Sequence, residues 1–176
     1  RVIEDAAHAF GSKYQNKLVG SIGDIVCFSF DGIKNITSGE GGCVVTNDSK
    51  VIENIKNSRL LGVEKDSDKR YNNSRSWNFN VSKQGWRYHM SNIMAAIGIQ
   101  QLKKFNKFAI RRKQIATAYD KLLSLNQNIL FLNRDYKNVV PHIYVVRIEN
   151  LNDRDGLREA MYKEGVEIGV HYTPNH

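Results

Sequence analysis

Short apolar runs alternate with longer amphipathic stretches along this chain, a pattern that predicts a mixed α/β fold. Apolar runs of strand length lie in both the N-terminal and the C-terminal part. The strands predicted from them are residues 2–4, 25–30, 42–46, 142–148 and 167–171.

Amphipathic periodicity predicts four helices, at residues 49–61, 91–102, 107–125 and 153–164. Ser49 is the expected N-cap of the first helix, and Gly165 the expected stop of the last. Residues 62–82 are polar and rich in Asp, Asn and Ser, so a long loop is expected there. Strand, helix and strand in succession after Asn126 predict a small α/β domain, which divides the chain into residues 1–125 and 126–176.

The 176 residues suffice for one sizeable domain or a large part of two. Apolar residues make up 41% and charged residues 25%, as in ordinary globular proteins. No apolar run approaches the about 20 residues of a membrane span, and no signal peptide is visible, so no membrane partner is expected. Cys27 and Cys43 lie at no metal-ligand spacing, which favours buried thiols in a reducing cytoplasm and no metal site; a disulfide stays conceivable.

The net charge of +8 and the isoelectric point near 9.5 permit binding to nucleic acid. The densest basic cluster, residues 103–113, alternates with apolar positions, which is typical of the solvated face of an amphipathic helix. No nucleic-acid-binding motif accompanies it, and we therefore expect no nucleic-acid partner.

Lys34 lies in a short loop between two apolar runs and is followed by small residues. A loop lysine held by two strands can be aimed at a bound aldehyde to form a Schiff base, although most loop lysines are solvated surface charges. Upstream, Asp5 lies at the end of the predicted strand of residues 2–4, directly after Glu4, with His8 three residues on. A carboxylate can keep the pyridine nitrogen of pyridoxal phosphate protonated; the alternative is that Asp5 caps a turn.

Four blocks, in order along nearly the whole chain, resemble the DegT/DnrJ/EryC1/StrS family of pyridoxal-phosphate-dependent sugar aminotransferases. The first two are residues 4–8 and the stretch from Gly23 to Gly42 around Lys34. The others are residues 85–102, with Gly-Trp-Arg-Tyr-His-Met-Ser-Asn at their start, and residues 171–176, His-Tyr-Thr-Pro-Asn-His.

The resemblance implies the aspartate aminotransferase fold, that of the fold type I pyridoxal-phosphate enzymes. The chain would then be an interior to C-terminal segment of the large domain plus part of the small α/β domain. It also implies a cytoplasmic homodimer that uses pyridoxal 5′-phosphate. This enzyme would move an amino group from an amino acid, with glutamate expected, to a keto sugar of a nucleoside diphosphate, and Lys34 would form the internal aldimine.

The same resemblance assigns roles to residues on the cofactor side. Asp5 is implied as the partner of the pyridine nitrogen, and His8 lies where the family has Gln or His near the ring hydroxyl. Ser29 matches a serine that contacts the phosphate, with a small strand residue as the alternative. Arg87 stands where many members have an Asn that reaches the phosphate of the partner's cofactor across the dimer interface; an interface ion pair is the alternative.

Other positions depart from the family or concern the substrate. His89 replaces the usual Arg, and Asp31-Gly32 replaces a pair that often includes His. The resemblance therefore does not determine which residues form the substrate pocket. His171 and Tyr172 are implied to line that pocket, with packing at a strand end as the alternative.

Two rival functions remain. A related sugar dehydratase uses the pyridoxamine form of the cofactor and has His in place of the lysine, so Lys34 argues against it. The other rival is a non-catalytic binding protein of the same fold.

Overall fold

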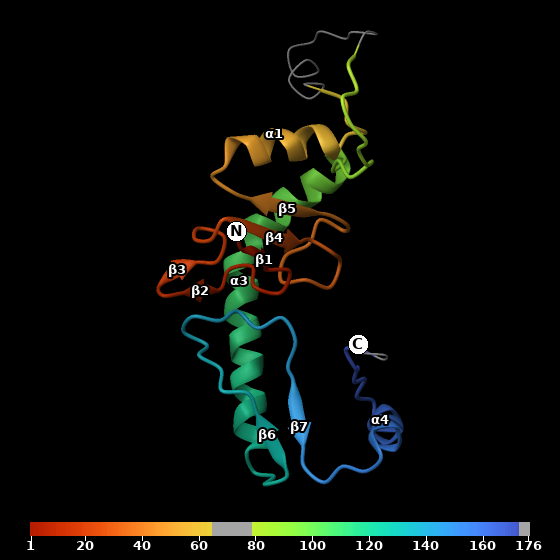
Figure 1. Cartoon of the computed structure of the whole chain (residues 1–176). Coiled ribbons are helices and arrows are strands. Elements are labelled where there is room, and N and C mark those ends of the chain that lie inside the picture. Colours follow the sequence, from red (N-terminus) through yellow and green to blue (C-terminus); the bar gives the residue numbers. More distant parts are fainter. Residues whose placement is uncertain (65–78, 173–176) are drawn as a thin grey trace. The chain divides into compact units, whose positions relative to one another are not determined.

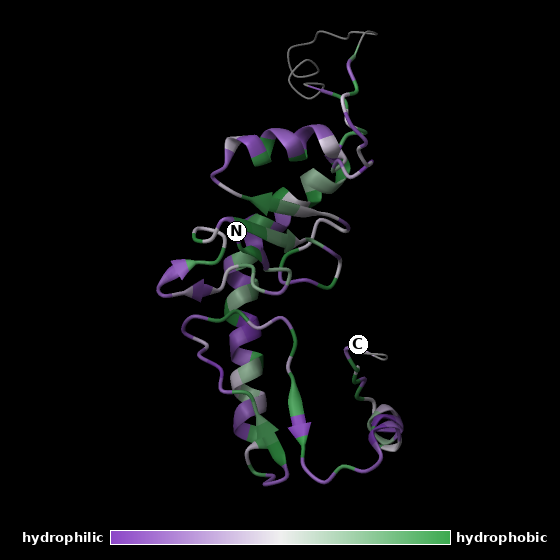
Figure 2. Ribbon diagram, viewed as in Figure 1, coloured by the Kyte–Doolittle hydropathy of each residue, from purple (hydrophilic) through white to green (hydrophobic). Residues whose placement is uncertain are grey.

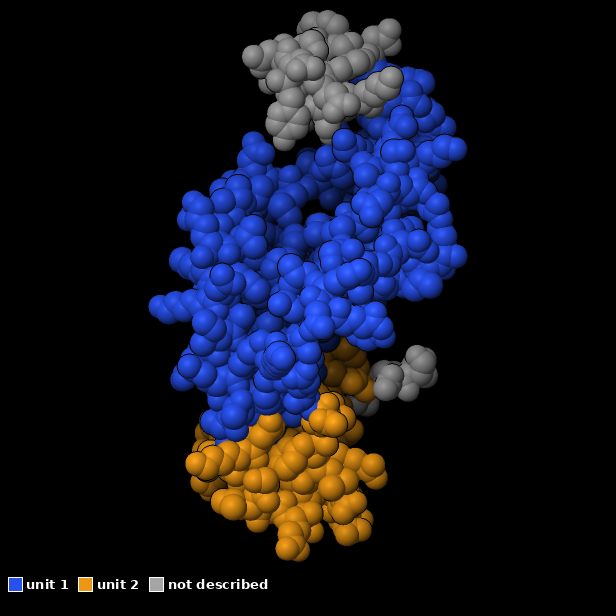
Figure 3. Space-filling model, turned by 90° about the vertical axis from the view of Figure 1, so that its left-hand side faces the viewer, with its two compact units in different colours: residues 1–118, 134–144 blue, residues 119–133, 145–176 orange. Residues whose placement is uncertain are grey.

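The computed structural model describes residues 1–64 and 79–172, and the chain forms two compact units. Unit 1 comprises residues 1–118 and 134–144, and unit 2 comprises residues 119–133 and 145–176 (Figure 3). The expected division into domains at Asn126 stays a prediction.

A three-stranded sheet organises unit 1, with β1 (Ile3–Asp5), β4 (Ile25–Ser29) and β5 (Gly42–Val45) side by side in that order (Figure 1). β1 and β4 run parallel, with Asp5 opposite Cys27, and β4 and β5 run antiparallel. These strands lie within one residue of the predicted ranges. Ala6, Val26 and Phe28 form the buried centre, because alternate residues of a strand point to the same face. Figure 2 shows the hydrophobic colouring of β4, which suits this burial.

A small hairpin of β2 (Lys13–Tyr14) and β3 (Lys17–Leu18) was not predicted. Its turn residues Gln15 and Asn16 have φ values of 49° and 63°. Positive φ at both turn positions matches the right-handed twist of a two-residue hairpin, and Asn adopts this conformation readily.

The first helix, α1 (Ser49–Ser58), begins one residue after its true N-cap, so the assignment of the cap to Ser49 was wrong. Asp48 accepts hydrogen bonds from the backbone N–H groups of Lys50 and Val51. The carboxylate therefore satisfies two donors that a helix start leaves open. The helix also ends earlier than residue 61, because Leu61 has a φ of 60°.

The polar segment after α1 is described only at its ends. Val63 and Val81 form an isolated antiparallel bridge, as do Leu60 and Arg87. Residues 65–78, the greater part of the predicted loop, lie outside the described residues.

A single helix, α3 (Asn92–Leu123), replaces the two helices predicted for residues 91–102 and 107–125. The intervening residues contain neither Pro nor Gly, and Asn106 continues the helix with its side chain exposed. The expected break was wrong because a dense run of lysines is compatible with an uninterrupted helix. None of the helices in the described part of the chain is long and apolar enough to cross a membrane.

Unit 2 contains β6 (Ile129–Phe131) paired antiparallel with β7 (Val146–Ile148), and α4 (Arg154–Lys163). Asp153 caps α4, and Gly165 follows it with a φ of 79°, as predicted. The strand predicted at 142–148 is shorter, because only the three residues opposite β6 have a ladder partner. The strand predicted at 167–171 is wrong: no strand is assigned there in the described chain, and a strand needs a partner.

Candidate functional site

Two of the predicted site residues end neighbouring parallel strands. Asp5 is the last residue of β1 and Ser29 the last of β4. Because the strands are parallel, their carboxyl ends lie at the same edge of the sheet, where the loops that follow can form a ligand site. His8 and Lys34 lie in these two loops, which brings four of the predicted residues to one edge.

The loop that carries Lys34 is shaped by short-range hydrogen bonds. Asp31 accepts one bond at its backbone carbonyl from the Lys34 N–H, at 3.1 Å, and one at Oδ1 from the Ile33 N–H, at 3.1 Å. The Asp31 N–H in turn donates to Ser29 Oγ at 3.4 Å. The residues that follow the strand thus form a compact turn rather than an open loop.

The side chain of Lys34 is half-buried, and its Nζ lies 2.9 Å from Nε2 of His8. This contact joins the loop after β4 to the loop after β1, across 26 residues of sequence. The amine is therefore aimed rather than freely solvated, which favours the Schiff-base interpretation of this lysine over that of a surface charge.

Asp5 is exposed, and its Oδ1 accepts a hydrogen bond from the backbone N–H of Ala7 at 3.0 Å. The alternative interpretation, a carboxylate that caps a turn, is thus present in the structure. The two roles are compatible, because a carboxylate has two oxygens and about four lone-pair sites.

The residue after the lysine anchors the loop from the buried side. Asn35 is 3% exposed, and its Nδ2 donates to the carbonyls of Val140, at 3.1 Å, and Phe10, at 3.4 Å. Ile36 and Ser38 are also buried. Gly39 then turns the backbone at a φ of 86°, as expected for the glycine-rich run.

Two residues that the sequence analysis missed complete this cluster. The ring of His142 lies with its centroid 4.2 Å from that of His8. Arg112 of α3 donates to the carbonyl of His142 at 3.0 Å and to that of Lys34 at 3.4 Å, and burial lowers the pKa of its guanidinium. No local motif marks either residue, because both meet Lys34 only through the fold.

The remaining predicted residues belong to other elements of the chain. Arg87 is exposed and pairs its backbone with Leu60; among the described residues, no hydrogen bond or ion pair joins it to Lys34. His171 and Tyr172 belong to unit 2, where both are exposed and their rings meet edge to face at 4.9 Å. The rest of their sequence block, residues 173–176, lies outside the described residues.

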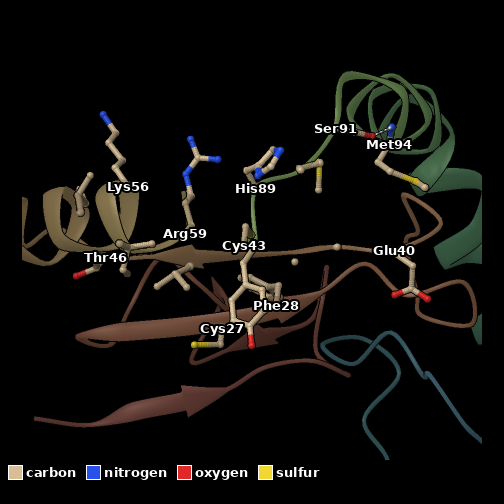
Figure 4. A pocket seen from close by; sticks show the side chains of 17 residues that line it. Cys27, Phe28, Glu40, Cys43, Thr46, Lys56, Arg59, His89, Ser91 and Met94 are labelled. Atoms are coloured by element: carbon tan, nitrogen blue, oxygen red, sulfur yellow. Dashed lines mark hydrogen bonds between the residues drawn. The ribbon is translucent and has the colours of Figure 1, made fainter. Parts of the chain in front are cut away.

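A cavity of about 960 Å³ in unit 1 lies between β5, α1 and the segment that leads into α3. Figure 4 shows Cys43 on β5, with Lys56 and Arg59 projecting from α1 and its C-terminal end. None of the predicted site residues lines this cavity. His89 does, and its Nδ1 is buried without a hydrogen-bond partner in the described chain. Burial raises the pKa of the Cys43 thiol, and the neighbouring Cys27 adds to the effect.

Comparisons with known proteins identify the family of this chain. The model of the DegT/DnrJ/EryC1/StrS aminotransferase family matches residues 1–176. The chain is 35% identical to the UDP-4-amino-4,6-dideoxy-N-acetyl-beta-L-altrosamine transaminase of Campylobacter jejuni subsp. jejuni serotype O:23/36. It is 36% identical to the GDP-perosamine synthase of Escherichia coli O157:H7. Each match covers 99% of this chain and 45% of the relative, so the chain spans about half the length of these curated relatives.

Among solved structures, the sugar aminotransferase Spr1654 from Streptococcus pneumoniae in its PMP form matches with a TM-score of 0.86 and 30% identity. The match covers 98% of this chain and 45% of that one. The PLP form of the same protein also matches, with a TM-score of 0.82. The fold of this chain therefore matches part of the fold of the pyridoxal-phosphate-dependent sugar aminotransferases, and these neighbours indicate pyridoxal phosphate as the cofactor. The chain belongs to the DegT/DnrJ/EryC1/StrS aminotransferase family.

Proposed function

We propose that this protein is a pyridoxal-phosphate-dependent aminotransferase that transfers an amino group from glutamate to a keto sugar carried by a nucleoside diphosphate. The observation that carries the proposal is the aimed amine of Lys34, 2.9 Å from His8, at the sheet edge where Asp5 and Ser29 end their strands. The similarity to a UDP-sugar transaminase and to a GDP-perosamine synthase supports nucleotide-linked sugars as the substrate class.

The residues at this edge fit the cofactor by their chemistry. An amine can bind an aldehyde, a carboxylate can pair with a pyridine nitrogen, and a hydroxyl at a strand end can donate to a phosphate oxygen. Pyridoxal phosphate, when bound, supplies the aldehyde and an electron sink for the reacting carbon. We assign Lys34 to the aldehyde, Asp5 to the pyridine nitrogen, His8 to the ring hydroxyl and Ser29 to the phosphate.

In this proposal Lys34 has two tasks. Its Nζ would hold the cofactor before the amino donor arrives, and the freed amine would then serve as the base that carries the proton from the amine-bearing carbon. The neighbouring His8 Nε2 keeps the amine directed while it is free. The turn built on Asp31 and the buried anchor of Asn35 fix where the lysine backbone lies.

The working unit in this proposal is a cytoplasmic homodimer. Arg87 is exposed, as a residue that reaches a partner subunit must be before assembly, and its planar guanidinium suits a phosphate. We place His171 and Tyr172 at the substrate. Two free cysteines agree with a reducing compartment.

The sugar dehydratase remains the first alternative, and a lysine rather than a histidine at position 34 argues against it. A non-catalytic protein of the same fold is the second. An aimed, half-buried lysine is not needed for binding alone, which favours the enzyme.

The decisive experiment incubates the whole protein with pyridoxal phosphate, glutamate and a panel of nucleotide-linked keto sugars, followed by mass spectrometry. The proposal expects an amino sugar and stoichiometric 2-oxoglutarate with at least one member of the panel. Release of 2-oxoglutarate without any amino sugar would point to another acceptor. If neither 2-oxoglutarate nor an amino sugar forms, the non-catalytic alternative is favoured. A dehydrated sugar would favour the dehydratase.

A further inference from the structure

A single guanidinium from α3 contacts the backbone on both sides of the Lys34 cluster. Arg112 Nη1 donates to the carbonyl of His142 at 3.0 Å and to that of Pro141 at 3.4 Å. Its Nη2 donates to the carbonyl of Lys34 at 3.4 Å. One side chain thus joins two segments that are more than 100 residues apart in the sequence.

These bonds close a ring of contacts. The Lys34 amine meets His8, the ring of His8 lies against that of His142, and the carbonyl of His142 accepts from Arg112. Arg112 then returns to the backbone of Lys34 itself. All four residues belong to unit 1, so the ring is internal to one compact unit.

The partners of Arg112 are main-chain oxygens rather than a charged group. Within residues 1–64 and 79–172, no carboxylate forms an ion pair with it, and burial is the cause that lowers its pKa. A planar fork with several donors can bond three carbonyls at once, whereas a lysine presents its donors from one nitrogen. The contact therefore fixes the geometry of the backbone and neutralises no acid.

We propose that Arg112 is a positioning residue for the reaction, which clamps the Lys34 backbone to the His142 segment so that the lysine amine and His8 stay aligned. This inference rests on the proposed function of Lys34. Arg112 acts on the reaction through Lys34 and His142, because its contacts are with their backbone oxygens.

The test uses the whole protein and three variants, Arg112→Met, Arg112→Lys and the control Arg111→Met. Arg111 is the adjacent residue of α3 and is exposed, so its variant removes the same charge without touching the clamp. Hydrogen exchange of the peptides that carry Lys34 and His142 is measured first, without cofactor. The half-reaction with glutamate is then followed by the absorbance of the loaded cofactor, at several glutamate concentrations.

The proposal expects faster exchange in both peptides of Arg112→Met and unchanged exchange in Arg111→Met. Because a displacement of about 1 Å can cost up to roughly a hundredfold in rate, we expect the limiting rate of the half-reaction to fall by about ten- to a hundredfold. The apparent glutamate affinity should stay within about twofold of the wild type, since Arg112 does not bind the donor. Arg112→Lys should recover part of the lost rate, because it keeps the charge and one donor group.

Unchanged exchange in both peptides of Arg112→Met would overturn the clamp. So would an unchanged limiting rate, or a weakened glutamate affinity at a normal rate. If the wild-type protein binds no cofactor while Arg112→Met still loosens both peptides, the clamp stands and the proposed function fails, so the two can be told apart.

Discussion

Replacing Asn35 by Ala tests whether the lysine loop is anchored from its buried side. The substitution removes the amide that donates to the carbonyl of Val140, a residue only 3% exposed, and to that of Phe10. A buried polar group that loses its partner costs about 1–3 kcal/mol. Water reaches the Val140 carbonyl poorly, so losing the hydrogen bond to this carbonyl should cost nearly the full free energy. The 3.4 Å bond to the Phe10 carbonyl is long and contributes less.

One term acts in the opposite direction. Asn35 Oδ1 is buried without a hydrogen-bond partner among the described residues, so its removal relieves an unsatisfied acceptor. We therefore expect a net destabilisation of about 1–2 kcal/mol, within the range for a lost buried hydrogen bond. For a chain of this size that corresponds to a fall in melting temperature of roughly 2–8 °C.

The assay is thermal unfolding of the whole protein, with two companion variants. Asn106→Ala, on the exposed side of α3, should change stability by less than about 0.5 kcal/mol. Asn35→Asp has nearly the same shape but no donor, and it would place a charge beside two carbonyls, so it should be less stable than Asn35→Ala. An Asn35→Asp variant as stable as the wild type would refute the anchoring role.

Three further predictions concern single side chains. Asp5→Asn keeps an acceptor for the Ala7 N–H and so should keep the fold. Loss of the charge-assisted bond should raise the activation free energy of turnover by about 2 kcal/mol or more, measured by steady-state kinetics. Near-normal turnover would leave Asp5 as a cap alone. Arg87→Ala mixed with Lys34→Ala should restore one working site per heterodimer, since the Arg87→Ala subunit keeps its own Lys34 and receives Arg87 from its partner; a dead mixture in which heterodimers form would exclude action across the interface. Arg1 and backbone N–H groups lower the pKa of Asp48, so its stabilising effect should be full above the unfolded pKa near 3.8 and disappear as pH falls through the folded pKa. Urea unfolding of wild type and Asp48→Ala should differ at pH 7 and converge in acid, and a difference that persists unchanged in acid would contradict this assignment.

The sheet edge could be predicted from sequence because its information is local. The strands predicted at residues 2–4 and 25–30 end within one residue of Asp5 and Ser29, and the glycines after Lys34 mark a turn, so the strand ends and the loops that follow lie close to where they were expected. Parallel pairing of the two strands then brings these loops together.

The parts that could not be predicted depend on distant or competing contacts. Arg112 and His142 reach Lys34 only after α3 and the segment near residue 140 have packed, and no spacing in the sequence encodes that meeting. The cap of α1 was assigned to the wrong residue because Asp48 and Ser49 are both good N-caps, and the bonds to Lys50 and Val51 decide between them.

The most direct measurement of the central claim is to find which lysine holds the cofactor. The whole protein is loaded with pyridoxal phosphate, reduced with borohydride, digested, and mapped by mass spectrometry, with Lys34→Ala as the control. We predict that the mass of the reduced cofactor lies on the peptide that contains Lys34, and that it is lost in the control. Cofactor on any other lysine, or equal labelling of Lys34→Ala, would contradict the account.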